Sequence, residues 1–93
     1  MKNMIYKSEK GDLDLSKVTR LYPAAVVDMH GEVAEMSLEW MEMNEGKVKL
    51  VHFVLVFDFT PLNEDVKERT TLVFQTKEAL LNEMNEVAQF FQD

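Results

Sequence analysis

One apolar segment, Lys47–Phe59 (KVKLVHFVLVFDF), constrains the fold more than any other part of the chain. After its first residue only Lys49, His52 and Asp58 are polar, and the others are valine, leucine or phenylalanine, a composition typical of a β-strand. Because successive side chains of a strand point to opposite faces, this strand is apolar on both sides. It must therefore be covered on both sides.

The phenylalanine side of this strand gives the first candidate interaction residues. Phe53, Leu55 and Phe57 share one face, and each buried aromatic side chain removes roughly 150–250 Å² from water. Since the chain offers one clear helix, which can cover one face, we expect the face with these residues to form a homodimer contact bordered by Met41 and Met43. The competing interpretation is a monomer whose strongly bent sheet wraps this face around the helix.

The segment Glu32–Met43 permits two interpretations. As a strand, its apolar residues alternate with polar ones at a period of two. As a helix, its glutamates would share one stripe, and most of its residues are strong helix formers. We favour the strand because the apolar residues segregate to one face only in that conformation. The helix would give a ferredoxin-like layer of helix on sheet.

Two turn sequences flank this segment. His30–Gly31 predicts a tight turn, and Asn44–Gly46 predicts a type I turn followed by a left-handed glycine. The second turn predicts a hairpin in which Met43 pairs with Lys47. A register slipped by one residue would be more amphipathic, and a β-bulge within residues 50–53 would satisfy both the turn and the pattern.

A C-terminal helix is predicted over Lys77–Gln92. Thr76 is a good N-cap, because its hydroxyl can accept from the free amides of the first turn. The apolar residues recur at helical spacing and form one stripe. They are Leu80, Leu81, Met84, Val87, Ala88 and Phe91.

The remaining elements follow from shorter patterns. Pro23 suits a strand start or an edge, because it has no N–H group to donate. A polar loop is expected over Thr60–Arg69. The other segments with extended patterns are Asn3–Lys7, Asp12–Val18, Ala24–Met29 and Thr70–Gln75. Together these elements predict an α+β fold: a curved antiparallel sheet of about five strands, a meander resembling half a barrel, with the one C-terminal amphipathic helix packed on it. We expect the 93 residues to form a single small domain, 1–93.

Charge limits the partners. The net charge is -7, and no lysine or arginine lies between Arg20 and Lys47, where several acidic residues fall. Such a surface repels phosphate backbones and anionic headgroups, so we expect no nucleic acid and no membrane as partner. The chain has no cysteine, and its first residues lack the apolar run of a signal peptide. We expect a cytoplasmic protein.

Few residues suggest chemistry. The sequence has no phosphate-binding, nucleophile-elbow or zinc-protease motif, and we expect no catalytic residue, no metal and no cofactor. We expect a non-catalytic protein-interaction or assembly module that forms a homodimer, or binds a protein partner, through an apolar sheet face. The alternative is a small-ligand-binding domain or small enzyme with a pocket between the sheet and the C-terminal helix, where His52 would be the polar anchor.

Overall fold

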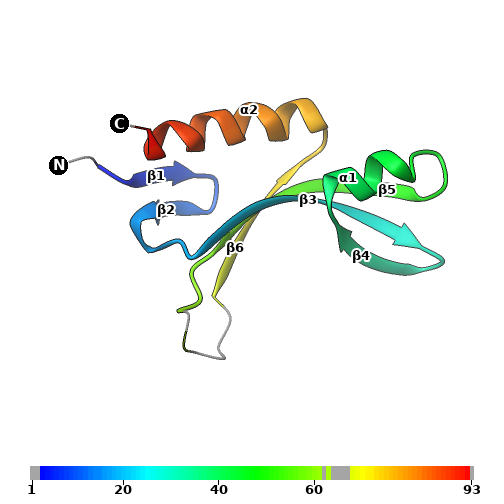
Figure 1. Ribbon diagram of the computed structural model, residues 1–93, viewed down its shortest axis with the longest axis horizontal. Coiled ribbons are helices and arrows are strands. Elements are labelled where there is room, and N and C mark those ends of the chain that lie inside the picture. The colour runs from blue at the N-terminus through cyan, green and yellow to red at the C-terminus, as the bar shows by residue number, and fades with distance from the viewer. Residues whose placement is uncertain (1–2, 62, 64–67, 93) are drawn as a thin grey trace.

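The computed structural model describes residues 3–61, 63 and 68–92. Its strands form a two-stranded sheet, β1-β2, and an open four-stranded antiparallel sheet with the order β4-β3-β5-β6 (Figure 1). The predicted α+β class is confirmed, with six strands in two sheets. The elements are β1 (Ile5–Ser8), β2 (Gly11–Asp14), the 3-10 helix η1 (Leu15–Lys17), β3 (Arg20–Met29), β4 (Glu32–Met36), α1 (Leu38–Met43), β5 (Lys49–Asp58), β6 (Arg69–Phe74), α2 (Lys77–Ala88) and the 3-10 helix η2 (Gln89–Phe91).

β5 is the central strand that its composition predicts. It pairs antiparallel with β3 on one side and with β6 on the other. All residues from Phe53 to Asp58 are buried, because β5 lies between two neighbouring strands whose side chains pack around its own. The polar loop expected between β5 and β6 lies partly outside the described residues.

The prediction of a single strand over residues 32–43 is wrong in its second half. β4 ends at Met36, and α1 begins after Ser37. The Ser37 hydroxyl accepts a hydrogen bond of 3.1 Å from the backbone N–H of Trp40, which makes Ser37 an N-cap. The cap and the strong helix formers that follow it override the alternation of apolar and polar residues. Three residues of α1 pack against the main core: Leu38, Trp40 and Met41.

The predicted hairpin around Asn44–Gly46 is absent for the same reason, and the pairing of Met43 with Lys47 is wrong. This turn joins α1 to β5, and Gly46 has a φ of 84°. β3 takes the place beside β5, so the sheet is not a simple meander. The tight turn at His30–Gly31 is confirmed between β3 and β4, with φ angles of 55° and 87°.

A bulge interrupts β5 within the expected range, but its partner is β3. Val26 pairs with His52 and Val27 with Leu50, which leaves Val51 without a partner on β3. A bulge bends the strand and restores alternation on either side of it. As a result Leu50 joins Phe53 in the main core.

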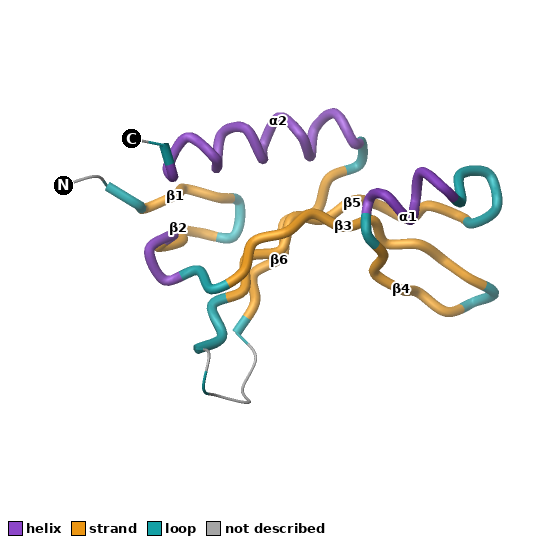
Figure 2. The backbone as a smooth tube through the Cα atoms, viewed as in Figure 1, coloured by secondary structure: helices purple, strands orange, loops and turns teal. Residues whose placement is uncertain are grey.

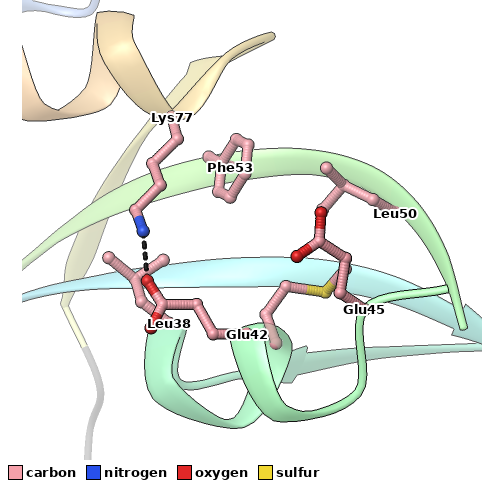
Figure 3. A pocket seen from close by; sticks show the side chains of 7 residues that line it. Leu38, Glu42, Glu45, Leu50, Phe53 and Lys77 are labelled. Carbon is pink, nitrogen blue, oxygen red and sulfur yellow. Dashed lines mark hydrogen bonds and ion pairs between the residues drawn. The ribbon is translucent and has the colours of Figure 1, made fainter. Parts of the chain in front are cut away.

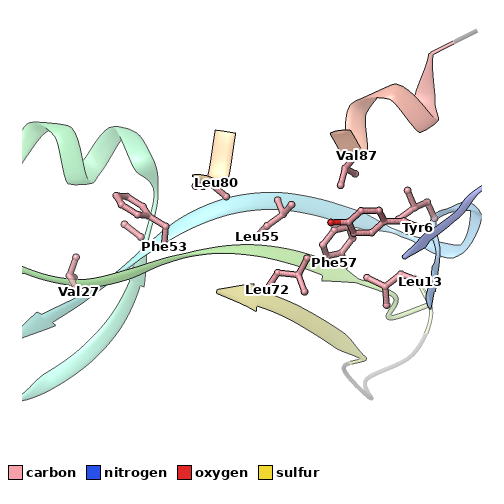
Figure 4. Close-up of a cluster of buried hydrophobic side chains, with 11 residues drawn as sticks. Tyr6, Leu13, Val27, Phe53, Leu55, Phe57, Leu72, Leu80 and Val87 are labelled. Carbon is pink, nitrogen blue, oxygen red and sulfur yellow. The ribbon is translucent and has the colours of Figure 1, made fainter. Parts of the chain in front are cut away.

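Both α-helices and the β1-β2 hairpin lie on one side of the four-stranded sheet (Figures 1 and 2). The main core fills the space between these two layers (Figure 4). Tyr6 of β1 stacks on Phe57 of β5 with ring centroids 5.7 Å apart, and meets Phe90 edge-on at 6.0 Å. Such aromatic contacts stabilise beyond the area they bury. The first strand is therefore fixed between β5 and the end of α2.

The predicted C-terminal helix is confirmed as α2 followed by η2. Thr76 is its N-cap, and its hydroxyl accepts from the Ala79 N–H at 3.1 Å. Leu80 and Val87 are fully buried against the sheet. Leu81, in contrast, is 41% exposed, so the buried stripe is narrower than the sequence indicates.

Candidate interaction surface

The second face of the four-stranded sheet has no helix or hairpin over it in the described part of the chain. A small apolar cluster lies on it, made by Ala24, Val54 and Val56, with Tyr22 and Val26 packed around them. All of these residues come from β3 and β5, whereas the main core contains residues of the sheet, of the β1-β2 hairpin and of both helices. We call this side the open face. Its residues, from the pairing of the strands, are Tyr22, Ala24, Val26, Val33, Glu35, His52, Val54, Val56, Thr71 and Val73, with the charged residues Arg20, Asp28, Lys49, Asp58 and Arg69 toward the strand ends.

The centre of the open face is apolar and shielded by its own neighbours. Its three buried members are only 1–3% exposed. They are flanked by side chains of the adjacent strands, with Tyr22 beside Val56 and Val73 beside Val54. The Arg20 guanidinium lies 5.2 Å from the centroid of the Tyr22 ring, a cation–π contact at the margin of the cluster. The face is therefore apolar at its centre and polar at this margin.

Exposed apolar side chains continue the open face toward both sheet edges. Val33 on β4 is 66% exposed, and Val73 on β6 is 43% exposed. Burial, followed by the carboxylate of Glu35, raises the pKa of Tyr22 above its ordinary value. The Tyr22 hydroxyl is therefore neutral at physiological pH and adds no charge to this surface.

The outer edge of β6 carries backbone groups with no partner among the described residues. The N–H of Phe59 donates to the carbonyl of Glu68 at 2.7 Å, which fixes the pairs of the β5-β6 ladder that are hydrogen-bonded. Hydrogen-bonded and non-bonded pairs alternate in an antiparallel ladder, so every second residue of β6 directs its N–H and C=O outward. These residues are Arg69, Thr71 and Val73.

The other free edges of this sheet are less suited to pairing. By the same alternation, the backbone of Pro23 on β3 faces away from β5. The pairing of β3 with β4 begins only at Ala25, so Pro23 faces no neighbouring strand on that side, and its missing N–H costs no hydrogen bond within the sheet. β4 is five residues long and carries Glu32 and Glu35. β6 (RTTLVF) has neither proline nor an acidic residue. β6 is therefore the edge most open to another strand.

The structure places Phe53, Leu55 and Phe57 in the main core rather than on an exposed face. They are 8%, 1% and 0% exposed, and they lie beneath the helical layer (Figure 4). The expectation is wrong because more elements cover this face of the sheet than the sequence indicates. The β1-β2 hairpin and α1 add to α2, so the apolar face left open is the opposite one.

The two expected border residues, Met41 and Met43, lie on α1. Met43 is 78% exposed, whereas Met41 lines a hollow of about 580 Å³ between α1, β5 and the start of α2 (Figure 3). An ion pair between Lys77 and Glu42 bridges the two helices across this hollow. The other lining residues are Leu38, Glu45, Leu50 and Phe53. The hollow thus has an apolar floor and a charged rim.

His52 does not line this hollow. It is half-buried and pairs with Val26 on the open face, while the adjacent Phe53 points into the main core. The sheet therefore separates His52 from the space beside α2 in which it was expected to act.

No family model, no curated protein and no solved structure matches this chain. In residues 3–61, 63 and 68–92, no group of three or more histidine and acidic side chains is placed to hold a metal ion. None of the helices described here is long and apolar enough to cross a membrane. The open face and the free edge of β6 are therefore the features that bear on function.

Proposed function

We propose that this protein is a non-catalytic assembly module that self-associates as a homodimer through the open face of its four-stranded sheet. The one-sided arrangement of the layers carries this proposal. Both helices and the hairpin cover one face, and the apolar cluster on the other consists of sheet residues alone. The cluster itself is already buried, so the gain on association comes from exposed apolar side chains of the same face such as Val73. Burying a large apolar side chain contributes up to roughly 1.5–3 kcal/mol, which favours a self-complementary two-fold contact over exposure to water.

A ligand-binding function has less support. A pocket between sheet and helix would need a polar anchor, and His52 lies on the other side of the sheet. The hollow that does lie between the helices has Lys77 and Glu42 already paired with each other. Self-association of the open face is therefore the better account.

The substitution Val73→Glu tests the proposal. Val73 is 43% exposed and lies next to Val54 on the open face. A glutamate there would have to lose its hydration when this part of the face is covered, so we expect the dissociation constant of the homodimer to rise by at least about tenfold. Sedimentation velocity from low micromolar to several hundred micromolar protein measures this change.

The matched control is Leu81→Glu. Leu81 is 41% exposed, almost as much as Val73, but it belongs to α2 and not to the open face. The same change in charge at this position should leave the dissociation constant unchanged. A wild-type protein that stays monomeric over the whole range, or equal weakening by both substitutions, would contradict the proposal.

A further inference from the structure

We infer that two copies of the chain meet at β6, whose free edge pairs antiparallel with β6 of the second copy about a two-fold axis. This inference rests on the proposed self-association and names the strand at which it occurs. Pairing at this edge would join four strands from each copy into one continuous sheet. The two open faces would then lie side by side on the same surface, and the second copy would cover each of them at its β6 margin, where Val73 is 43% exposed, and not over its centre.

The backbone of β6 supplies the attraction. Arg69, Thr71 and Val73 direct their N–H and C=O groups away from β5, and no described residue takes them up. A row of free donors and acceptors is a template for another strand, because main-chain hydrogen bonds form whatever the side chains are. Thr71 and Val73 are also β-branched, which suits them to a paired strand.

Side-chain parity limits the register. Residues paired across two strands have their side chains on the same face of the sheet. About a two-fold axis, residues at equal distances before and after the axis are paired. They share a face only if the axis passes through a residue and not between two residues. An axis at Leu72 sets Thr71 opposite Val73 of the second copy, and both have outward backbone groups. An axis at Thr71 would set Arg69 opposite Val73, a charged side chain against an apolar one. Cross-strand pairs of β-branched residues are the more favourable, so the axis lies at Leu72.

Charge and space also favour this edge. Each copy carries a net charge of -7, and Arg69 is the only charged residue of β6, whereas β4 presents two glutamates. On the helix side, a hollow of about 160 Å³ lies beside the strand. Leu72, Phe74 and Tyr6 line it together with the charged residues Lys7, Glu9 and Glu83. The strand β6 itself therefore brings fewer negative charges to the contact than β4 would, and the hollow leaves room for side chains of the incoming strand.

Amide hydrogen exchange of the wild-type protein tests this inference residue by residue. The amides of Leu72 and Phe74 bond to β5 and should be protected at every concentration. The amides of Thr71 and Val73 point outward, so they should exchange at least about tenfold more slowly when the dimer forms. The measurement uses NMR of ¹⁵N-labelled protein at tens and at several hundred micromolar.

The outcomes separate this inference from the proposed function. If sedimentation shows a dimer but the Thr71 and Val73 amides keep their exchange rates, the β6 contact is overturned and self-association stands. If the protein stays monomeric, the proposed function itself fails. Slowed exchange at Thr71 and Val73, with the exchange of the Leu72 and Phe74 amides unchanged, supports both.

A proline scan of two sheet edges gives a second test. Thr71→Pro removes an outward N–H without removing a bond to β5, so the fold should persist, and protection of the Leu72 amide reports this. We expect the dissociation constant to rise at least about tenfold. Val33→Pro makes the same change at an outward position of β4 and should have no effect. Equal weakening by both prolines would overturn the inference.

Cysteine cross-linking tests the register. The sequence has no cysteine, so each introduced thiol is unique. Residues of a hydrogen-bonded antiparallel pair have Cα atoms about 5.5 Å apart, within the range that a disulfide spans. An equimolar mixture of Thr71→Cys and Val73→Cys proteins should therefore form the mixed disulfide under mild oxidation. Efficient cross-linking of Thr71→Cys with itself would overturn the axis at Leu72.

Discussion

Tyr6 is the residue that fixes the N-terminal hairpin to the rest of the molecule. Its ring is buried against Phe57 and Phe90, and its hydroxyl donates a hydrogen bond to the carboxylate of Glu83 on α2. Burial of the hydroxyl, and then the hydrogen bond to Glu83, raise the pKa of Tyr6 well above its ordinary value. One side chain thus combines packing with a charge-assisted hydrogen bond.

The raised pKa of Tyr6 predicts a loss of stability in alkaline solution. Tyr6 keeps its proton in the folded state at a pH where an unfolded tyrosine loses it, near 10. Its contribution is therefore complete below about pH 10 and is lost as the pH rises toward the folded pKa. We expect Tyr6→Phe to lower the free energy of unfolding by roughly 1.5–3 kcal/mol at pH 7, the range for hydrogen bonds to charged groups.

Chemical denaturation between pH 7 and strongly alkaline pH measures this effect. The difference between wild type and Tyr6→Phe should shrink above about pH 10, because the variant has no hydroxyl to titrate there. A difference that stays constant across the range would mean that the hydroxyl does not titrate as its surroundings indicate.

At the scale of elements, the parts that are locally determined could be predicted from the sequence. The C-terminal helix has its cap and its stripe within Thr76–Gln92, and the central strand has its composition within Lys47–Phe59. The pairing of β5 with β3 is a contact between distant segments, and no local pattern encodes it. The split of residues 32–43 into β4 and α1 depended on Ser37, whose side chain acts as a cap only once the backbone turns.

The candidate surface was misplaced for a related reason. The sequence identifies which side chains are apolar, but the number of elements that cover them depends on the whole fold. Phe53 and Leu55 are apolar enough to form an interface, yet the hairpin and α1 cover them with α2. The outward residues of β6 could not be found from the sequence, because they follow from the hydrogen-bonding phase of the β5-β6 ladder.

The N-cap of α1 gives a test at the scale of elements. Ser37→Ala removes the hydroxyl that accepts from the Trp40 N–H, and loss of such a cap costs about 1 kcal/mol. Ser37→Asp restores an acceptor at the same place and should recover that loss. Urea denaturation compares the free energies of unfolding. Equal stability of Ser37→Ala and wild type would show that α1 does not depend on its cap.

At the scale of the whole molecule, shape and charge act together. The protein is elongated, with extents of 47 × 31 × 21 Å, because α1 and α2 cover different parts of one long sheet (Figure 2). Lys77 and Glu42 form the ion pair that bridges these two helices. The net charge of -7 is spread over this small surface, so two copies repel each other when they approach.

This repulsion predicts how self-association responds to salt. The screening length falls from about 10 Å at 0.1 M to about 3 Å at 1 M ionic strength. We expect the dissociation constant of the homodimer to fall several-fold over this range, because the main-chain hydrogen bonds and the Thr71–Val73 contacts at β6 are uncharged and the repulsion acts over a distance. Sedimentation velocity in sodium chloride measures it. Weaker association at high salt would show instead that ion pairs between copies hold the interface.

The contact of Tyr6 with Phe90 has a consequence for the synthesis of the protein. The ribosome makes β1 first, but the rings that enclose Tyr6 belong to β5 and to the segment after α2. A nascent chain that has not yet reached Phe90 cannot complete the packing of its own hairpin. A two-stranded hairpin is marginal in water by itself, so we expect the hairpin of β1 and β2 to become stable only when these rings are available. We therefore expect folding to be completed only after η2, which follows α2 and carries Phe90, has left the ribosome.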